Sequence, residues 1–127
     1  CTSSCPANLT GKKLSPRKIM MDTRDRLEEV GKNIDSNKGV FVPDTKSLLN
    51  DYITPEELWA CTSCNACVEE CPVNISPLSI IMDMRRYLVM EQSAAPQSLN
   101  AMMTNIENNV APWQYNQMDR LNWKDEN

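Results

Sequence analysis

The chain has 127 residues, a net charge of −4 and no histidine. Its charges are spread along the sequence and lack the basic patch that nucleic-acid binding requires, and no run of about 18 apolar residues predicts a membrane span. The absence of histidine excludes serine–histidine and cysteine–histidine nucleophile pairs, histidine-ligated zinc enzymes and Rieske-type iron ligation. The chemistry must therefore come from the six cysteines.

The first element is a cysteine pair followed by proline, in the pattern C-x3-C-P over residues 1–6. Because no initiator methionine precedes it, we expect the sequence to begin inside a longer protein. Ser15 and Pro16 then predict a helix start, since serine caps helix N-termini and proline fits the first turn. We expect this helix over residues 16–32, followed by a polar connection over 33–46.

Four cysteines lie close together in the middle of the chain, at Cys61, Cys64, Cys67 and Cys71, with Pro72 directly after them. This is the C-x2-C-x2-C-x3-C-P run of cluster-binding ferredoxins, whose fourth cysteine ligates the other cluster in two-cluster proteins. A zinc site would usually show two C-x2-C pairs with a longer spacer. Disulfides fit poorly, because cysteines three apart are badly placed to bridge. The run predicts a [4Fe–4S] cluster.

Helices are also expected over residues 55–60, 77–92 and 96–109. The first of these begins with threonine, proline and a capping-box glutamate, and Arg85 interrupts the apolar face of the second. No alternating pattern of useful length predicts a strand, so the expected fold class is all-α. The tail over 112–123 carries several large apolar side chains, which favours docking against this domain, a further domain or another chain.

An internal repeat relates the two halves of the chain. Residues 15–27 and 76–88 align with seven of 13 positions identical, and a C-x3-C-P segment precedes each copy. Cys1 and Cys5 would then be the third and fourth cysteines of a first run whose first two cysteines precede residue 1. The unit of cysteine run, loop and helix is thus used twice, which predicts a pseudo-two-fold architecture.

These cysteine runs and Ser-Pro helices resemble the α-helical two-cluster ferredoxin domain of heterodisulfide reductase C subunits, glycerol-3-phosphate dehydrogenase C subunits and glycolate oxidase iron–sulfur subunits. The resemblance covers residues 1–110, with the first cysteine run incomplete, and leaves 111–127 as an aromatic tail or linker. It implies that one cluster is bound by four thiolates, those of Cys5, Cys61, Cys64 and Cys67. It also implies that Cys1 and Cys71 belong to a second cluster. We expect one complete [4Fe–4S] site within the 127 residues and a second in a longer protein.

The resemblance implies electron transfer as a module or subunit of a larger oxidoreductase. We expect no catalytic residue and no substrate site in the chain itself, and a flavin- or quinone-linked redox partner. The expected location is the cytoplasm or the cytoplasmic face of a membrane that holds such a partner. Two alternatives stay open: a structural metal-binding or interaction module without a redox role, and a thiol–disulfide enzyme. The second has a C-x2-C motif but no βαβ pattern around it.

Overall fold

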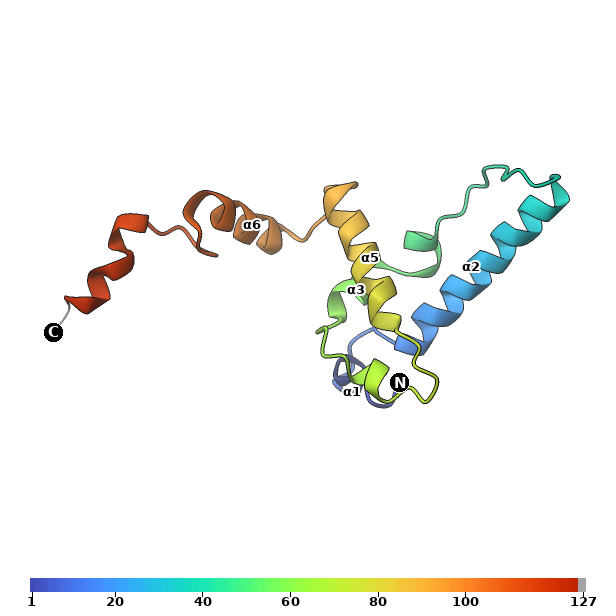
Figure 1. The fold of residues 1–127 in the computed structure, drawn as a ribbon, viewed down its shortest axis with the longest axis horizontal. Coiled ribbons are helices and arrows are strands. Elements are labelled where there is room, and N and C mark those ends of the chain that lie inside the picture. Colours follow the sequence, from blue (N-terminus) through green and yellow to red (C-terminus); the bar gives the residue numbers. More distant parts are fainter. Residues whose placement is uncertain (126–127) are drawn as a thin grey trace. The chain divides into compact units, whose positions relative to one another are not determined.

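The computed structural model describes residues 1–125, which form helices and loops without a strand. The helices in chain order are α1 (Pro6–Leu9), α2 (Pro16–Ser36), η1 (Leu48–Tyr52), α3 (Pro55–Ala60), α4 (Ala66–Glu69), α5 (Pro77–Met90), α6 (Gln97–Asn109) and η2 (Gln117–Lys124) (Figure 1). The all-α prediction is confirmed. None of the helices in this described part is long and apolar enough to cross a lipid bilayer.

The chain divides into two compact units, Cys1–Tyr87 and Leu88–Asn127, and the division falls in the last turn of α5. The first unit holds all six cysteines. The second holds α6 and η2, and α6 buries none of its side chains within the described residues. Trp113 and Trp123 of the tail are also exposed. The boundary expected at residue 110 and the docking of the tail stay predictions.

The helix starts follow from local sequence. The Ser15 hydroxyl accepts a hydrogen bond from the Lys18 N–H ahead of a first-turn proline. At the start of α3, Thr54 and Glu57 form the expected capping box. Such caps satisfy the N–H groups that a helix N-terminus leaves unpaired. Helix α2 continues four residues beyond its expected end, since the chain first takes left-handed conformations at Lys38 (φ 57°) and Gly39 (φ 90°).

The core of the first unit lies where α2, α3, α5 and the segment after η1 meet. Its most deeply buried side chains are Pro16, Ile19, Ile53, Leu58 and Ile81. Burying one such aliphatic side chain contributes about 1.5–3 kcal/mol to stability. Cys5 and Ala7 are buried as well, so the core reaches the end of the unit that carries the cysteines.

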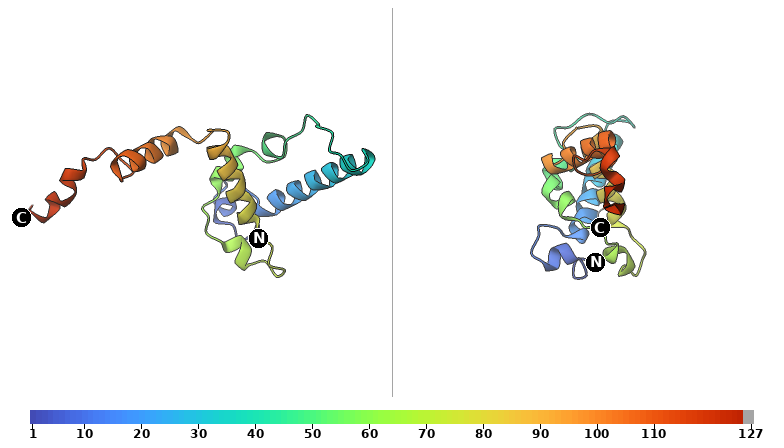
Figure 2. Two further views of the ribbon diagram at one scale, coloured as in Figure 1. Left: turned by 45° about the horizontal axis from the view of Figure 1, so that its top comes forward. Right: turned by 90° about the vertical axis from the view of Figure 1, so that its left-hand side faces the viewer.

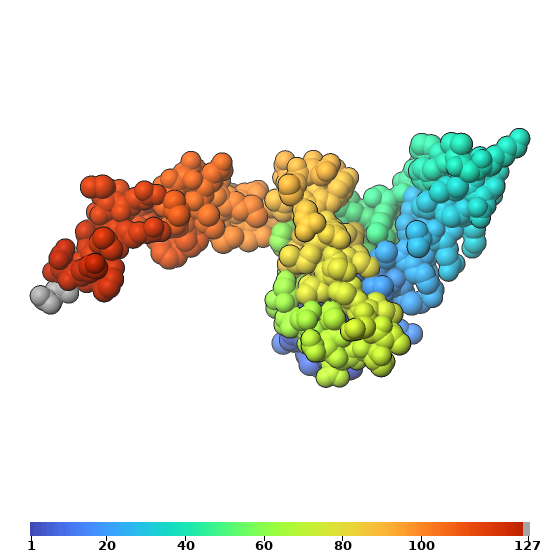
Figure 3. Space-filling model, in the orientation of Figure 1, coloured from blue at the N-terminus to red at the C-terminus, as the bar shows by residue number. Residues whose placement is uncertain are grey.

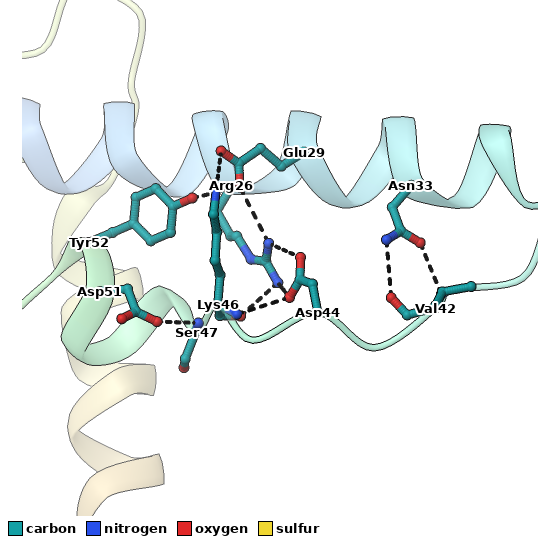
Figure 4. Close-up of polar contacts among 9 residues, drawn as sticks. All are labelled: Arg26, Glu29, Asn33, Val42, Asp44, Lys46, Ser47, Asp51 and Tyr52. Carbon is teal, nitrogen blue, oxygen red and sulfur yellow. Dashed lines mark hydrogen bonds and ion pairs between the residues drawn. The ribbon is translucent and has the colours of Figure 1, made fainter.

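A polar network holds the connection after α2 against that helix (Figure 4). Arg26 donates to both carboxylate oxygens of Asp44, each at 2.6 Å, and to the Lys46 carbonyl at 2.8 Å. Glu29, one turn further on, accepts from the Tyr52 hydroxyl at 2.6 Å and from the Lys46 ammonium at 3.2 Å. The network fixes the path of the chain into η1 and from there into α3.

The N-terminal segment with α1 and the segment with α4 are far apart in sequence but lie side by side at one end of the first unit, as Figure 2 shows from two directions. In the space-filling view, residues of the four-cysteine run and of the loop after it form the surface at this end (Figure 3). The two cysteine-bearing segments thus share one end of the unit.

Candidate metal centre

All six cysteines are free thiols in the first unit. Cys5 is buried and occupies the N-cap position of α1 without a capping side-chain hydrogen bond. Cys61 ends α3, and Cys67 lies in the short helix α4. Cys64 lies in the loop between these two helices, and Cys71 directly follows the turn after α4. Helix ends and tight loops, rather than helix faces, therefore present the thiols.

The loop between Cys61 and Cys67 is strongly curved. Ser63 and Asn65 both take left-handed backbone conformations, with φ values of 56° and 65°. Such conformations cost energy for a residue with a side chain, and they persist where surrounding structure demands them, often at ligand sites. The curvature brings the Ser63 N–H to within 3.4 Å of the Cys61 sulfur. This is the geometry expected of a loop that wraps around a group bound by its cysteines.

Backbone N–H groups also favour the thiolate forms of Cys64 and Cys71. The Ala66 N–H and then the Thr62 hydroxyl lower the pKa of Cys64. The Ile75 N–H, 3.3 Å from the Cys71 sulfur, is the largest cause of a lowered pKa at Cys71. Since the thiolate is the form that binds metal, these donors prepare both sulfurs for ligation.

Cys67 behaves in the opposite way. Burial raises its pKa, and the neighbouring thiols of Cys61, Cys5 and Cys64 raise it further. These three thiols lie close enough to Cys67 to disfavour a negative charge on it, so a positive charge among the sulfurs would favour its thiolate. Cys5 joins this group from 56 or more residues away in the sequence.

A second grouping surrounds a cavity of about 190 Å³. The residues lining it are Cys1, Arg17, Met20, Met21, Cys67, Cys71, Ile75 and Pro77. They come from the two cysteine-bearing segments, from the first two turns of α2 and from the start of α5. The structure therefore brings Cys1 and Cys71, which the resemblance assigns to one cluster, to one cavity, and Cys67 lines it as well.

The donor set, thiols presented by several short segments, is the kind that an iron–sulfur cluster takes. Within residues 1–125 no three cysteine or carboxylate side chains converge as one bound ion would require. A tetrahedral zinc site needs four ligands around a single point. A cubane instead takes one thiolate per iron, so its ligands are spread around it, and it is tuned by N–H donors to sulfur such as those of Ser63 and Ile75.

Arg85 is the residue at this site that the sequence pattern does not assign a role. It donates to the Leu58 carbonyl through Nε at 3.0 Å and Nη2 at 2.6 Å, and to the Cys61 carbonyl through Nη2 at 2.5 Å. Its guanidinium also lies 4.9 Å from the centre of the Trp59 ring. The signal in the sequence is a cation on the apolar face of α5, where an interruption usually has a specific partner.

Comparison with known proteins agrees with this chemistry. Residues 1–75 match the family model of the 4Fe–4S dicluster domain. The chain belongs to the 4Fe–4S dicluster domain family. It is 35% identical over 155 aligned positions to the "Probable iron-sulfur-binding oxidoreductase FadF" of Bacillus subtilis, a match covering 99% of this chain and 22% of that protein. It is 33% identical over 144 positions to the "EtfAB:quinone oxidoreductase" of Syntrophomonas wolfei, covering 99% and 20% respectively.

A third relative is the C subunit of the ferredoxin/F(420)H(2)-dependent CoB-CoM heterodisulfide reductase of Methanosarcina acetivorans. It is 34% identical over 98 positions, which cover 76% of this chain and 46% of that relative. No solved structure matches the chain. The chain spans about a fifth of the length of the first two relatives.

As a 4Fe–4S dicluster domain, the chain is a [4Fe–4S]-binding electron-transfer module, and relatives that share it are named as iron–sulfur or quinone oxidoreductases and a heterodisulfide reductase subunit. The predictions of family, fold class, cofactor and electron-transfer role are confirmed. These findings do not support the two alternatives, a structural metal-binding or interaction module without a redox role and a thiol–disulfide enzyme. The assignment of individual cysteines to each cluster stays a prediction.

Proposed function

We propose that this chain relays electrons through two [4Fe–4S] clusters between a flavin- or quinone-linked donor and a further acceptor, on the cytoplasmic side of a membrane. Two relatives support the quinone and membrane link by their names. One is the quinone oxidoreductase of Syntrophomonas wolfei. The other is the "Probable membrane-anchored ferredoxin" of Chromohalobacter salexigens, which is 32% identical over 138 positions that cover 97% of this chain and 20% of that protein.

The proposed ligation is crossed between the two cysteine segments. Cys61, Cys64 and Cys67 hold one cluster together with Cys5, while Cys1 and Cys71 serve the other. The observation that carries this proposal is that the segment with Cys5 and the four-cysteine run lie side by side at one end of the first unit (Figure 2). Cys5 also contributes to the raised pKa of Cys67. The cavity shared by Cys1 and Cys71 supports the second half.

A [4Fe–4S] cluster held by these cysteines would supply one-electron chemistry at iron. The chain's own groups govern how easily this happens. N–H donors from Ser63 and Ile75 lie on sulfur, and such hydrogen bonds stabilise the more negative, reduced state. Cys5 is buried, so it would shield from water the side of a cluster that it ligated.

Cysteine-to-serine variants of the full-length protein, purified without oxygen, test the crossed ligation. Iron and sulfide content and the EPR spectra of the reduced clusters are measured for Cys5→Ser, Cys64→Ser and Cys71→Ser. We expect the first two variants to lose the same EPR signal and the third to lose the other. The proposal is wrong if Cys71→Ser loses the same signal as Cys64→Ser while Cys5→Ser keeps it. In that case the four-cysteine run is a local four-ligand site.

A further inference from the structure

We propose that Arg85 positions the first cysteine of the four-cysteine run and that its charge raises the reduction potential of the cluster bound there. The inference rests on the proposed function, because it concerns the cluster that Cys61 would ligate. It goes beyond that function by adding a residue that is not a ligand.

The contacts of Arg85 are concentrated on the chain just before and at Cys61. Two guanidinium nitrogens bind the Leu58 carbonyl in the last turn of α3, and one of them also binds the Cys61 carbonyl. The planar fork of arginine suits such paired acceptors, and a cation is favoured at the C-terminal end of a helix. The Trp59 ring beside the guanidinium adds a cation–π contact.

These contacts set the direction in which the chain enters the cysteine loop. Cys61 leaves α3 in an extended conformation, with φ −69° and ψ 128°, and its N–H bonds back to Leu58 at 3.3 Å. Leu58 itself is fully buried. The end of α3 is therefore fixed on one side by the core and on the other by Arg85, so the Cys61 sulfur is presented from a rigid anchor.

Among the described residues, no carboxylate pairs with the charge of Arg85. The ion pairs within residues 1–125 do not include it, and its hydrogen bonds to Leu58 and Cys61 all go to carbonyl oxygens. A cluster with four thiolate ligands carries a net negative charge that grows on reduction. A fixed cation in contact with a ligand's own residue therefore stabilises the reduced state more than the oxidised state.

The other copy of the repeat lacks this arrangement. Arg24 aligns with Arg85, but it pairs with Asp25 at 2.7 Å and lies near Glu28, and more than half of its side chain is exposed. Arg86, the neighbour of Arg85, is similarly exposed and pairs with Asp83. Arg86 thus offers a matched control on the same helix turn.

The test compares Arg85→Gln, Arg85→Lys and Arg86→Gln in the full-length protein purified without oxygen. The measurements are the midpoint potential from an EPR-monitored titration and the rate of cluster loss in air from visible absorbance. We expect Arg85→Gln to lower the potential and to speed cluster loss by roughly ten-fold, since about 1.4 kcal/mol of lost interaction corresponds to a factor of ten. Arg85→Lys should keep the potential but lose the cluster faster, and Arg86→Gln should match the wild type.

Equal potentials and equal loss rates in Arg85→Gln and Arg86→Gln would overturn the inference. An unchanged potential with faster loss would overturn its electrostatic part alone. If circular dichroism shows that Arg85→Gln has lost its helices, Arg85→Lys decides, and wild-type loss rates in that variant refute the positioning role.

A third measurement separates this inference from the proposed function. Hydrogen exchange in the metal-free protein should be faster over residues 59–64 in Arg85→Gln than in Arg86→Gln. Unchanged exchange there refutes the positioning role even if no variant binds iron. A wild-type protein that takes up no iron refutes the proposed function, and the exchange contrast still stands on its own.

Discussion

Helices α2 and α5 begin from nearly the same sequence but use it differently further along. Both start after a serine whose hydroxyl accepts a backbone N–H, and both have a buried proline in the first turn. Three turns later the aligned leucines differ, because Leu27 is 70% exposed and Leu88 only 4%. A repeat in sequence therefore fixes how a helix starts, whereas the surroundings of each copy decide which of its side chains are buried.

The middle of each helix shows the reason for this divergence. Helix α2 holds its surroundings with charged groups: Lys18 lies 3.0 Å from Glu57 of α3, and Arg26 binds the connection that follows α2. The positions aligned with these are Ser79, which bonds back to the Ser76 carbonyl, and Tyr87. The first copy contributes polar contacts, through Lys18 and Arg26. The second contributes apolar packing and Arg85.

The sharpest test of this comparison truncates the two aligned leucines. Leu88→Ala removes a buried side chain and should lower the free energy of unfolding by about 2–4 kcal/mol, as is usual for core leucines. Leu27→Ala should change it by less than about 0.5 kcal/mol, as exposed positions do. Urea unfolding of the metal-free protein, followed by circular dichroism, measures both. Similar losses in the two variants would mean that the copies pack alike after all.

The polar contact between α2 and α3 can be removed by a substitution at Glu57. This carboxylate is almost fully buried, caps α3 through Thr54 and pairs with Lys18. Glu57→Gln keeps the shape but removes the charge, and should lower stability by about 2 kcal/mol because a buried charge-assisted contact is lost. The control is Glu56→Gln on the exposed side of the same turn, which should leave the urea midpoint unchanged. If neither variant changes the urea midpoint, apolar contacts alone hold α2 and α3 together.

The same carboxylate gives the fold a dependence on pH. Burial alone would raise the pKa of Glu57, but the Thr54 N–H, Lys18 and the Thr54 hydroxyl outweigh it and lower the pKa below its ordinary value of 4.5. Its contribution is therefore fully present above about pH 4.5 and is lost as the pH falls through the lower folded value. Stability of the metal-free wild type should fall more steeply below pH 4.5 than that of Glu57→Gln. Parallel curves would contradict this.

The smallest effect is expected at the contact between Arg26 and Asp44. Hydrogen bonds from Arg26 hold the pKa of the Asp44 carboxyl below its usual range. The two side chains are 11% and 31% exposed, and the pair lies on a surface segment outside the core, so Asp44→Asn should lower the urea midpoint only slightly. It should instead speed hydrogen exchange over residues 38–46. Thr45→Ala, in the same segment, is the control. No change in exchange would show that the Asn33 contacts to Val42 hold this segment without Asp44.

The sequence was most informative where a cause is local. Serine and proline before α2 and α5, the capping box at Thr54 and the cysteine spacing all act through neighbouring residues, and their predictions agree with the helices observed. Long-range effects could not be read in the same way. The exposure of Leu27 and the contacts of Arg85 to Leu58 depend on which segments meet in space. The apolar periodicity of a single helix does not predict which other segments will contact it.

Cys64 differs from Cys5 in its exposure, which bears on electron transfer and on the access of dioxygen. It is exposed, whereas Cys5 is buried. A cluster ligated by both would show one edge to the solvent, and that edge would be the shortest path by which an electron could tunnel to a docked partner. The same opening would let dioxygen reach the iron. Covering this face when a partner binds would therefore speed transfer and protect the cluster at once.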